Sequence, residues 1–271
     1  MSRPPQTSTI SIHRHHAMAT AFEVRIAHED TSYAAQAAHA AFSVADRLES
    51  LLSRFDPHSE ITALAALTPG QSLQLSEPTF ACLTLSREME QLSVGAFSLS
   101  ATARRAGCPA AEWTLHPDLL SFTLISGQCL FDLGAIGKGF ALDRMAEELR
   151  EWGCSCFLLV AGGSSVLAGE APPSTVGWTA RLDGLASSGQ PESTTTLAHC
   201  ALGSSGTTLQ GRHITDPRTG LPATRRQRVW LQAPTAAEAD ALSTALMILD
   251  EREITALALR RPDLRMWLLP S

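Results

Sequence analysis

The segment FDLGAIGKGFALDRMAEEL, residues 131–149, constrains the possible structures of this chain more than any other. Three glycines and Lys138 stand between an apolar run and a pattern that predicts an amphipathic helix ending at Gly153. Glycines before a helix let backbone amides approach a phosphate, and the helix N-terminus favours negative charge. We therefore expect these amides to contact a nucleotide phosphate. Lys138 is either a second such contact or a surface lysine.

Two common phosphate-binding templates do not fit this segment. A P-loop requires Ser or Thr directly after the lysine, where this chain has Gly139. A dinucleotide fingerprint requires the spacing G-x-G-x-x-G, whereas the glycines stand at positions 134, 137 and 139. The segment therefore predicts a nucleotide site of neither class.

Charge and hydropathy exclude two classes of protein. The formal net charge is -6 and the basic residues are scattered. Their densest group, Arg225, Arg226 and Arg228, is typical of solvated surface, so we expect no nucleic-acid partner. No apolar run reaches the roughly 18 residues that a membrane-spanning helix needs. The N-terminus lacks the apolar core of a signal peptide, which predicts a cytoplasmic protein, or a periplasmic one if a leader has been removed.

Helical and extended patterns are intermixed along the chain without regular alternation. The predicted helices cover 33–52, a short stretch opened by Ser59, 77–92 with Ser76 as N-cap, 140–149 and one or two helices from 235. The predicted strands lie within 10–26 around a turn at Ala17-Met18, and at 120–131, 156–163, 178–182 and 228–233, with turns at 203–206 and 211–222. This favours an α+β fold, in which 10–271 form one compact unit of mixed β-sheets flanked by helices after a flexible tail, 1–9.

Polar and glycine-rich islands at 132–143, 162–165, 203–222 and 240–244 interrupt the apolar sequence and predict one site built from distant segments. Asp240 and Thr244 are four residues apart, so they share one face of a helix. Their oxygens suit Mg²⁺, which takes few protein ligands when substrate phosphates supply the rest. Alternatively, Asp240 caps its helix or both side chains are solvated. His213 is either a general base or a hydrogen-bonded loop histidine.

Seven motifs follow one another in a fixed order over nearly the whole chain. They are Met18-Ala19-Thr20, Ser59-Glu60-Ile61, DLGAIGKGFALD at 132–143, Gly162-Gly163, GSSG at 203–206, HITDPRTGLP at 213–222 and ADALST at 239–244. This order is similar to the pattern of the ApbE family, the FAD:protein FMN transferases. The resemblance implies Mg²⁺-dependent cleavage of the FAD pyrophosphate. It also implies protein flavinylation, in which FMN passes through its phosphate to a Ser or Thr hydroxyl in the flavinylation motif of an acceptor protein, releasing AMP.

The resemblance also implies roles for individual residues. Asp240 and Thr244 match the side chains that bind magnesium, and Ala135 matches a position that offers its backbone carbonyl. His213 matches the histidine that deprotonates the acceptor hydroxyl, and Lys138 matches a catalytic contact to the flavin nucleotide. The remaining expected contacts to the flavin nucleotide are Met18, Phe55, Ala96, Phe97, Ser98, Gly162, Gly163, His213 and Ile214.

Four positions depart from the family pattern. Ala19 replaces a glycine, Ser98 an aspartate, Ser164 an aspartate or asparagine, and Ser204 a threonine. The changes at Ser98 and Ser164 remove acidic or amide groups near the expected flavin pocket. Three hypotheses therefore stay open: transfer of FMN to a protein, hydrolysis of FAD to FMN and AMP, and flavin binding without catalysis. The metal pair argues against the third, because a passive flavin binder needs no metal beside the pyrophosphate.

Overall fold

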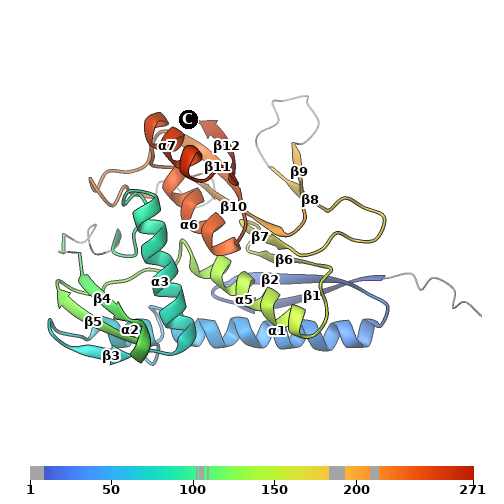
Figure 1. The fold of residues 1–271 in the computed structure, drawn as a ribbon, viewed down its shortest axis with the longest axis horizontal. Coiled ribbons are helices and arrows are strands. Elements are labelled where there is room, and N and C mark those ends of the chain that lie inside the picture. Colours follow the sequence, from blue (N-terminus) through green and yellow to red (C-terminus); the bar gives the residue numbers. More distant parts are fainter. Residues whose placement is uncertain (1–8, 102, 104–106, 109, 183–192, 208–213) are drawn as a thin grey trace, which may run out of the picture.

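The computed structural model describes residues 9–271 except 102, 104–106, 109, 183–192 and 208–213. Within this part of the chain an antiparallel seven-stranded sheet separates a layer of helices from a β-hairpin (Figure 1). The predicted tail lies outside the described residues, except for Thr9, which begins the first strand. Among the described helices, none is long and apolar enough to span a membrane.

The elements intermix as the sequence predicts, and the fold is α+β. The helices are α1 (Thr31–Leu52), α2 (Glu60–Ala65), α3 (Glu77–Leu92), α5 (Gly137–Glu151), α6 (Ala236–Leu246), α7 (Glu251–Arg260) and the 3₁₀ turn η1 (Pro117–Leu119). The large sheet has the order β1 (Thr9–Ala17), β2 (Thr20–His28), β6 (Phe157–Ala161), β7 (Ser165–Ala168), β10 (Cys200–Gly206), β11 (Arg226–Ala233) and β12 (Arg265–Pro270). The smaller sheets are β3 (Ser72–Gln74), β5 (Ser121–Ser126) and β4 (Glu112–His116), and β8 (Trp178–Arg181) with β9 (Thr194–Leu197).

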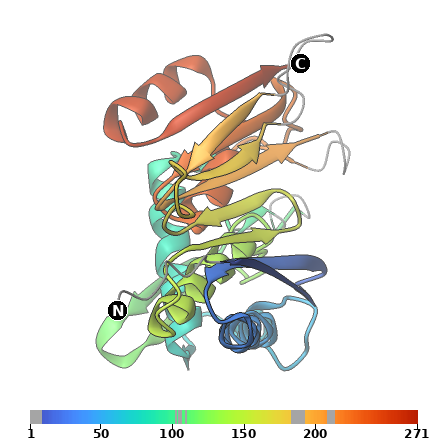
Figure 2. The same cartoon turned by 90° about the vertical axis from the view of Figure 1, so that its right-hand side faces the viewer.

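The strands from β6 to β11 are covered on both faces of the large sheet, whereas the β1–β2 hairpin is buried on one face only. Alternate residues of a strand point to opposite faces, so in β11 Val229 and Leu231 join the core under the helices while Trp230 joins a second core. Trp178 of β8 and Leu197 of β9 cover that second core. Figure 2 shows the sheet in profile, with α1 end-on beneath β1 and β2. The sheet is thus a rigid support for whatever α5 and α6 carry.

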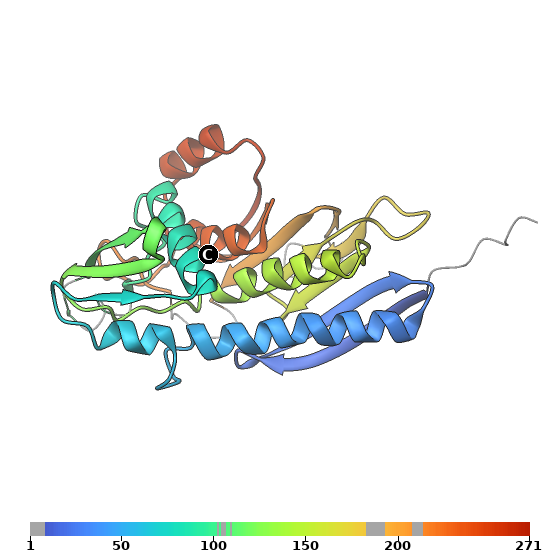
Figure 3. The same cartoon turned by 60° about the horizontal axis from the view of Figure 1, so that its bottom comes forward.

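The predicted helix at 33–52 is α1, which begins two residues earlier because Asp30 caps it by accepting the amides of Ser32 and Tyr33. Its buried face contains five alanines, and this small-residue face packs on β1, β2 and α5. Figure 3 shows α1 lying along the β1–β2 hairpin with α5 beside it. The helix predicted at 77–92 is also confirmed. However, the Ser76 hydroxyl donates to Glu60 instead of accepting a helix amide.

The first hairpin turns at Met18 and Ala19, one residue later than predicted, since Ala17 pairs with Thr20. Both turn residues have positive φ, 50° and 55°. A two-residue turn with this backbone matches the right-handed twist of its strands, and glycine adopts it most easily. The family pattern quoted above has glycine at position 19, and Ala19 adopts the same conformation at a cost in strain.

The prediction of a turn at 203–206 is wrong, because GSSG forms the end of β10 and pairs with β11. A Cβ at Gly203 would collide with the backbone of Ala239 in α6. Small residues therefore stand here because a helix crosses the strand closely, not because the chain reverses. The strand β12, which forms one edge of the large sheet, was not predicted from the sequence.

Candidate active site

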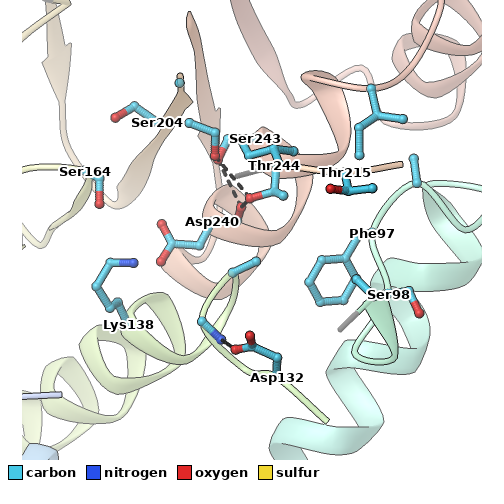
Figure 4. A pocket seen from close by; sticks show the side chains of 18 of the residues that line it. Phe97, Ser98, Asp132, Lys138, Ser164, Ser204, Thr215, Asp240, Ser243 and Thr244 are labelled. Atoms are coloured by element: carbon cyan, nitrogen blue, oxygen red, sulfur yellow. Dashed lines mark hydrogen bonds between the residues drawn. The ribbon is translucent and has the colours of Figure 1, made fainter. Parts of the chain in front are cut away.

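A cavity of about 430 Å³ opens where α5, α6, β10 and the segment after α3 meet. Two of its walls differ in construction. The α6 wall consists of Asp240, Ser243 and Thr244 with the supporting residues Ser165 and Ser205, and the loop wall consists of 96–98 and 214–217. Figure 4 shows Lys138 of α5 facing the α6 wall, with Phe97 and Ser98 on the opposite side. The site thus joins segments that are far apart in sequence.

Asp240 is the most strongly bound side chain of the α6 wall. Only 6% of its surface is exposed, and both carboxylate oxygens accept a hydrogen bond from the Ser165 hydroxyl, at 2.7 and 2.8 Å. The amide of Gly139 donates to Oδ2 at 2.9 Å. Asp240 lies inside the helix and not at its start, so both alternatives raised from the sequence, a helix cap and a solvated side chain, are wrong.

Burial raises the pKa of Asp240, because a carboxylate without water around it loses solvation energy. The charge of Lys138 and the donors Ser165 and Gly139 act in the opposite direction and favour the ionised form. Lys138 and Asp240 point toward each other in Figure 4. Lys138 therefore acts on the carboxylate through its charge, and a bound cation would stabilise the ionised form further.

Thr244 stands beside Asp240 on the cavity side of α6, as the spacing of four predicts. Its hydroxyl lies 3.2 Å from the Asp240 carbonyl, to which it donates, and 3.1 Å from the Ser205 hydroxyl. The same Ser205 hydroxyl is 2.9 Å from that of Ser243. The hydroxyls of the α6 wall are therefore held by one another and by the helix backbone.

The glycines of the 131–149 segment do not leave their amides open to a phosphate. The amide of Gly134 donates to Asp132 at 2.9 Å, that of Gly137 to the Leu133 carbonyl at 2.7 Å, and that of Gly139 to Asp240. In addition, a Cβ at Gly139 would collide with the Ala236 carbonyl of α6. The amides of the three glycines are therefore occupied within the protein, and Gly139 in addition allows α5 and α6 to touch.

The donor atoms of the cavity suit Mg²⁺. Asp240, Thr244 and Ala135, which lies two residues before α5, all line it and offer a carboxylate, a hydroxyl and a backbone carbonyl. Across the described part of the chain, no three His, Cys, Asp or Glu side chains gather in a group that could hold a metal. A site with so few charged ligands fits a hard cation that completes its shell with water and substrate phosphate, and does not fit zinc.

The loop wall is less tightly held. Phe97 is buried and its amide donates to Ser93, whereas the Ser98 hydroxyl accepts the amide of Ser100, two residues along the same loop. Phe55 is 80% exposed, and the Arg54 guanidinium lies 4.3 Å from the centre of its ring. Arg54 also reaches Asp132 at the cavity, at 3.5 Å. One arginine side chain thus separates an exposed aromatic ring from the cavity.

The sequence model of the ApbE family matches residues 18–268, which is most of the chain. This chain belongs to the ApbE family. A curated relative, the FAD:protein FMN transferase of Klebsiella pneumoniae (strain 342), is 32% identical over 130 residues. That match covers 44% of this chain and 36% of the relative, so it spans well under half of either protein.

Solved ApbE structures share the fold over nearly their full length. The flavinyl transferase ApbE of Pseudomonas stutzeri has a TM-score of 0.81 at 18% identity, covering 99% of this chain and 93% of that one. The ApbE protein of Thermotoga maritima has a TM-score of 0.79 at 19% identity, with coverages of 96% and 94%. The flavin transferase ApbE of Vibrio cholerae has a TM-score of 0.77 at 16% identity, with coverages of 96% and 93%.

Most residues expected from the ApbE pattern lie around one cavity. Those that line it are Ala96, Phe97, Ser98, Ala135, Lys138, Gly162, Ile214, Asp240 and Thr244. Met18, Phe55 and Gly163 are not part of the lining. Met18 lies in the hairpin turn next to Gly162, whose amide donates to the Ala21 carbonyl at 3.0 Å. His213 lies outside the described residues.

Three polar residues in or near the cavity were not predicted individually from the sequence. Ser165, which holds Asp240, lies at the end of the predicted island 162–165. The prediction of solvated surface at 225–228 is wrong for two arginines. Arg226 is 4% exposed and donates to the carbonyls of Leu246 and Leu249, while Arg228 lines the cavity.

Proposed function

We propose that this chain is a FAD:protein FMN transferase that uses Mg²⁺. The observation that carries the proposal is the buried Asp240 carboxylate, which stands with Thr244 on the α6 wall and faces Lys138 across the cavity. Membership of the ApbE family and the printed activity of the Klebsiella relative support this assignment. A cavity of about 430 Å³ has room for a nucleotide part of a ligand.

The α6 wall and α5 would hold the pyrophosphate end of FAD. Asp240, Thr244 and the Ala135 carbonyl are the ligands that we assign to Mg²⁺, which supplies charge neutralisation at the pyrophosphate when bound. Lys138 provides a second positive charge for the same group. Phosphoryl transfer depends mainly on positioning and on charge neutralisation, so a fixed pair of this kind is what the reaction needs.

In the proposed reaction, FMN is transferred by a single substitution at its phosphorus. The hydroxyl oxygen of an acceptor Ser or Thr forms a bond to the phosphorus of the FMN half, and the bond from that phosphorus to the oxygen of AMP breaks. AMP leaves with the electron pair, and the acceptor hydroxyl loses its proton. We assign the role of proton acceptor to His213, since it precedes Ile214 and Thr215, which line the cavity.

The flavin end of FAD would lie against the loop wall. Phe97, Ser98 and Ile214 line the cavity there. Phe55 lies outside the lining, beyond Arg54, and we assign its exposed ring to stacking on the isoalloxazine. Gly162 lines the cavity, and we assign its neighbours Gly163 and the Met18 turn to the same end of the ligand. These contacts form the proposed flavin-binding set.

Intact-mass measurement tests the proposal directly. The protein would be incubated with FAD, Mg²⁺ and a domain that carries a Ser/Thr flavinylation motif, while free nucleotides are quantified in parallel. We expect an adduct with the mass of FMN and an equal amount of AMP, both absent when EDTA replaces Mg²⁺. The matched control is an acceptor in which the target Ser or Thr is replaced by Ala, which should stay unmodified.

Other results would redirect the assignment. Equal amounts of FMN and AMP with no adduct on several acceptors would indicate an FAD pyrophosphatase. FAD that is bound and stays intact in the presence of Mg²⁺ would indicate a flavin-binding protein, and would contradict the roles given to Asp240 and Thr244.

A further inference from the structure

The carboxylate of Asp143, on α5, binds the N-terminus of α6. Its Oδ1 accepts the amide of Ala236 at 2.8 Å and its Oδ2 that of Ala237 at 2.9 Å. The next amide, that of Glu238, donates to Thr235 at 3.3 Å. A helix N-terminus has unpaired amides and partial positive charge. A carboxylate placed there accepts hydrogen bonds from the amides and is attracted by the charge. Two of these three amides therefore depend on a side chain from another helix.

The same two helices meet again one turn earlier on α5. Gly139 precedes Asp143 by four residues and shares its face of the helix. Its amide donates to Asp240 at 2.9 Å, and its missing side chain lets the Ala236 carbonyl approach. Residues 139–143 and 236–240 thus form a joint, and this joint sets the position of Asp240 relative to Lys138, which adjoins Gly139.

The other end of α6 is anchored separately. The buried Arg226 guanidinium of β11 donates to the carbonyls of Leu246 and Leu249, both at 2.7 Å. A cation at the C-terminus of a helix and an anion at its N-terminus both complement the helix dipole. Helix α6 is therefore held at both ends by charges from neighbouring elements, and only the Asp143 end adjoins the Asp240 and Lys138 pair.

We propose that Asp143 is a positioning residue for the α6 wall. It holds the start of α6 against α5 so that Asp240 and Thr244 keep a fixed distance from Lys138. Asp143 is not among the residues that line the cavity, so its effect on the reaction passes through α6. The inference rests on the proposed function, because the α6 wall is the surface to which Mg²⁺ is assigned.

The test compares Asp143→Ala with Asp30→Ala at pH 8. Asp30 is a matched control, because it also accepts two amides at a helix N-terminus, those of Ser32 and Tyr33 in α1. Three quantities are measured: the Mg²⁺ concentration for half-maximal adduct formation, the rise in melting temperature that Mg²⁺ causes with FAD present, and hydrogen exchange in a peptide covering 235–246.

We expect Asp143→Ala to need about tenfold more Mg²⁺ or more, as is typical when a residue that orients a metal ligand is lost. Its α6 peptide should exchange faster and its Mg²⁺-dependent rise in melting temperature should shrink. Asp30→Ala should lower the melting temperature and leave the Mg²⁺ requirement unchanged. Asp143→Asn keeps one amide acceptor and should fall between wild type and Asp143→Ala, and it replaces the alanine variant if that protein does not fold.

Two results would overturn the inference in distinguishable ways. If wild-type protein forms the adduct and both Asp143 variants keep the wild-type Mg²⁺ requirement, Asp143 has no positioning role and the proposed function stands. If wild-type protein shows no response to Mg²⁺ in adduct formation or in melting temperature, the metal assignment fails for the wild type itself, and the role of Asp143 fails with it.

Discussion

The α6 wall and the loop wall of the cavity differ in how their polar groups are satisfied. On the α6 wall, Asp240 is 6% exposed and Ser165 and Gly139 hydrogen-bond its carboxylate. On the loop side, Ser98 has one local bond and the nearby Phe55 is 80% exposed. Groups that stabilise charge act best when they are oriented before the substrate arrives, whereas loops adapt to the shape of a ligand. Under the proposed function, the phosphate chemistry would therefore belong to the α6 wall and flavin recognition to the loop side.

The largest effect should follow from Asp240→Asn. This change removes the charge that we assign to Mg²⁺ and should lower the rate of adduct formation about 10³-fold, equivalent to about 4 kcal/mol of transition-state stabilisation. Stability should not fall, because burial raises the pKa of Asp240 and a neutral amide avoids the cost of burying the charge. Rates from intact mass and melting temperatures check both expectations.

Glu238→Gln is the control for Asp240→Asn. Glu238 lies on the same helix, but its carboxylate pairs with Arg261 and it does not line the cavity. Its loss should leave the rate close to the wild-type value, since Glu238 is not part of the cavity lining. A wild-type rate in Asp240→Asn would contradict the assignment of Mg²⁺ to the α6 wall. The functional contrast between the two walls would then fail as well.

The second prediction concerns the contact that brings α6 to α5. Gly139→Ala should destabilise the fold by about 1–3 kcal/mol, because the added methyl group collides with the Ala236 carbonyl and forces the helices apart. Gly137→Ala, two residues earlier on the same helix, meets only the Leu133 side chain at 3.8 Å and should be stabilising by about 0.5–1 kcal/mol. Urea unfolding of both variants measures the difference, and equal stabilities would show that the close approach of α5 and α6 is not required.

The sequence predicts the elements of this fold better than it predicts their contacts. The helices at 33–52 and 77–92 were found because their apolar residues recur at the helical period, which is a local property. The spacing of Asp240 and Thr244 likewise predicted a shared face, and both line the cavity. Properties that depend on a few neighbouring residues were therefore accessible from the sequence.

Errors arose where a residue's role depends on a distant segment. Nothing near Gly139 reveals that its amide is used by Asp240, which lies 101 positions later. Similarly, Arg226 looks like surface until the end of α6 places two carbonyls beside it. The glycines of GSSG were taken for a turn because close packing and chain reversal select the same residue type. Local pattern cannot separate these cases, because the deciding contact is tertiary.

The third prediction concerns how the stability of the protein depends on pH through Asp143, which binds the N-terminus of α6. Burial raises the pKa of Asp143 from 3.8 to about 7, opposed by the amides of Ala236 and Ala237 and reinforced by the charges of Asp240 and Glu147. Between pH 3.8 and about 7, Asp143 therefore keeps a proton in the native protein that it has released in the unfolded chain. The contribution of this group to stability is therefore complete below about pH 4 and is lost as the pH rises toward 7, by at most about 1.4 kcal/mol per pH unit.

Urea unfolding at pH 5, 6, 7 and 8 tests this sign with Asp143→Asn as the reference, because the amide does not titrate. The stability of wild type relative to Asp143→Asn should fall from pH 5 to 7 and level off above it. A difference that stays constant over this range would show that Asp143 has an ordinary pKa, and that the carboxylate accepts the α6 amides at no cost in solvation.

The smallest expected effect concerns the loop side of the site. Phe55→Ala removes an exposed ring, so it should leave the melting temperature unchanged. If the ring stacks on the flavin, its loss should raise the dissociation constant for FAD about 2- to 12-fold, the equivalent of about 0.5–1.5 kcal/mol for one aromatic pair, with little change in the maximal rate. Leu259→Ala is the control, since Leu259 is 79% exposed on α7, and FAD binding should not change. A Phe55→Ala protein with wild-type FAD affinity and a lower maximal rate would instead place this ring at the acceptor, so that the exposed side of the site would serve the protein partner and not the flavin.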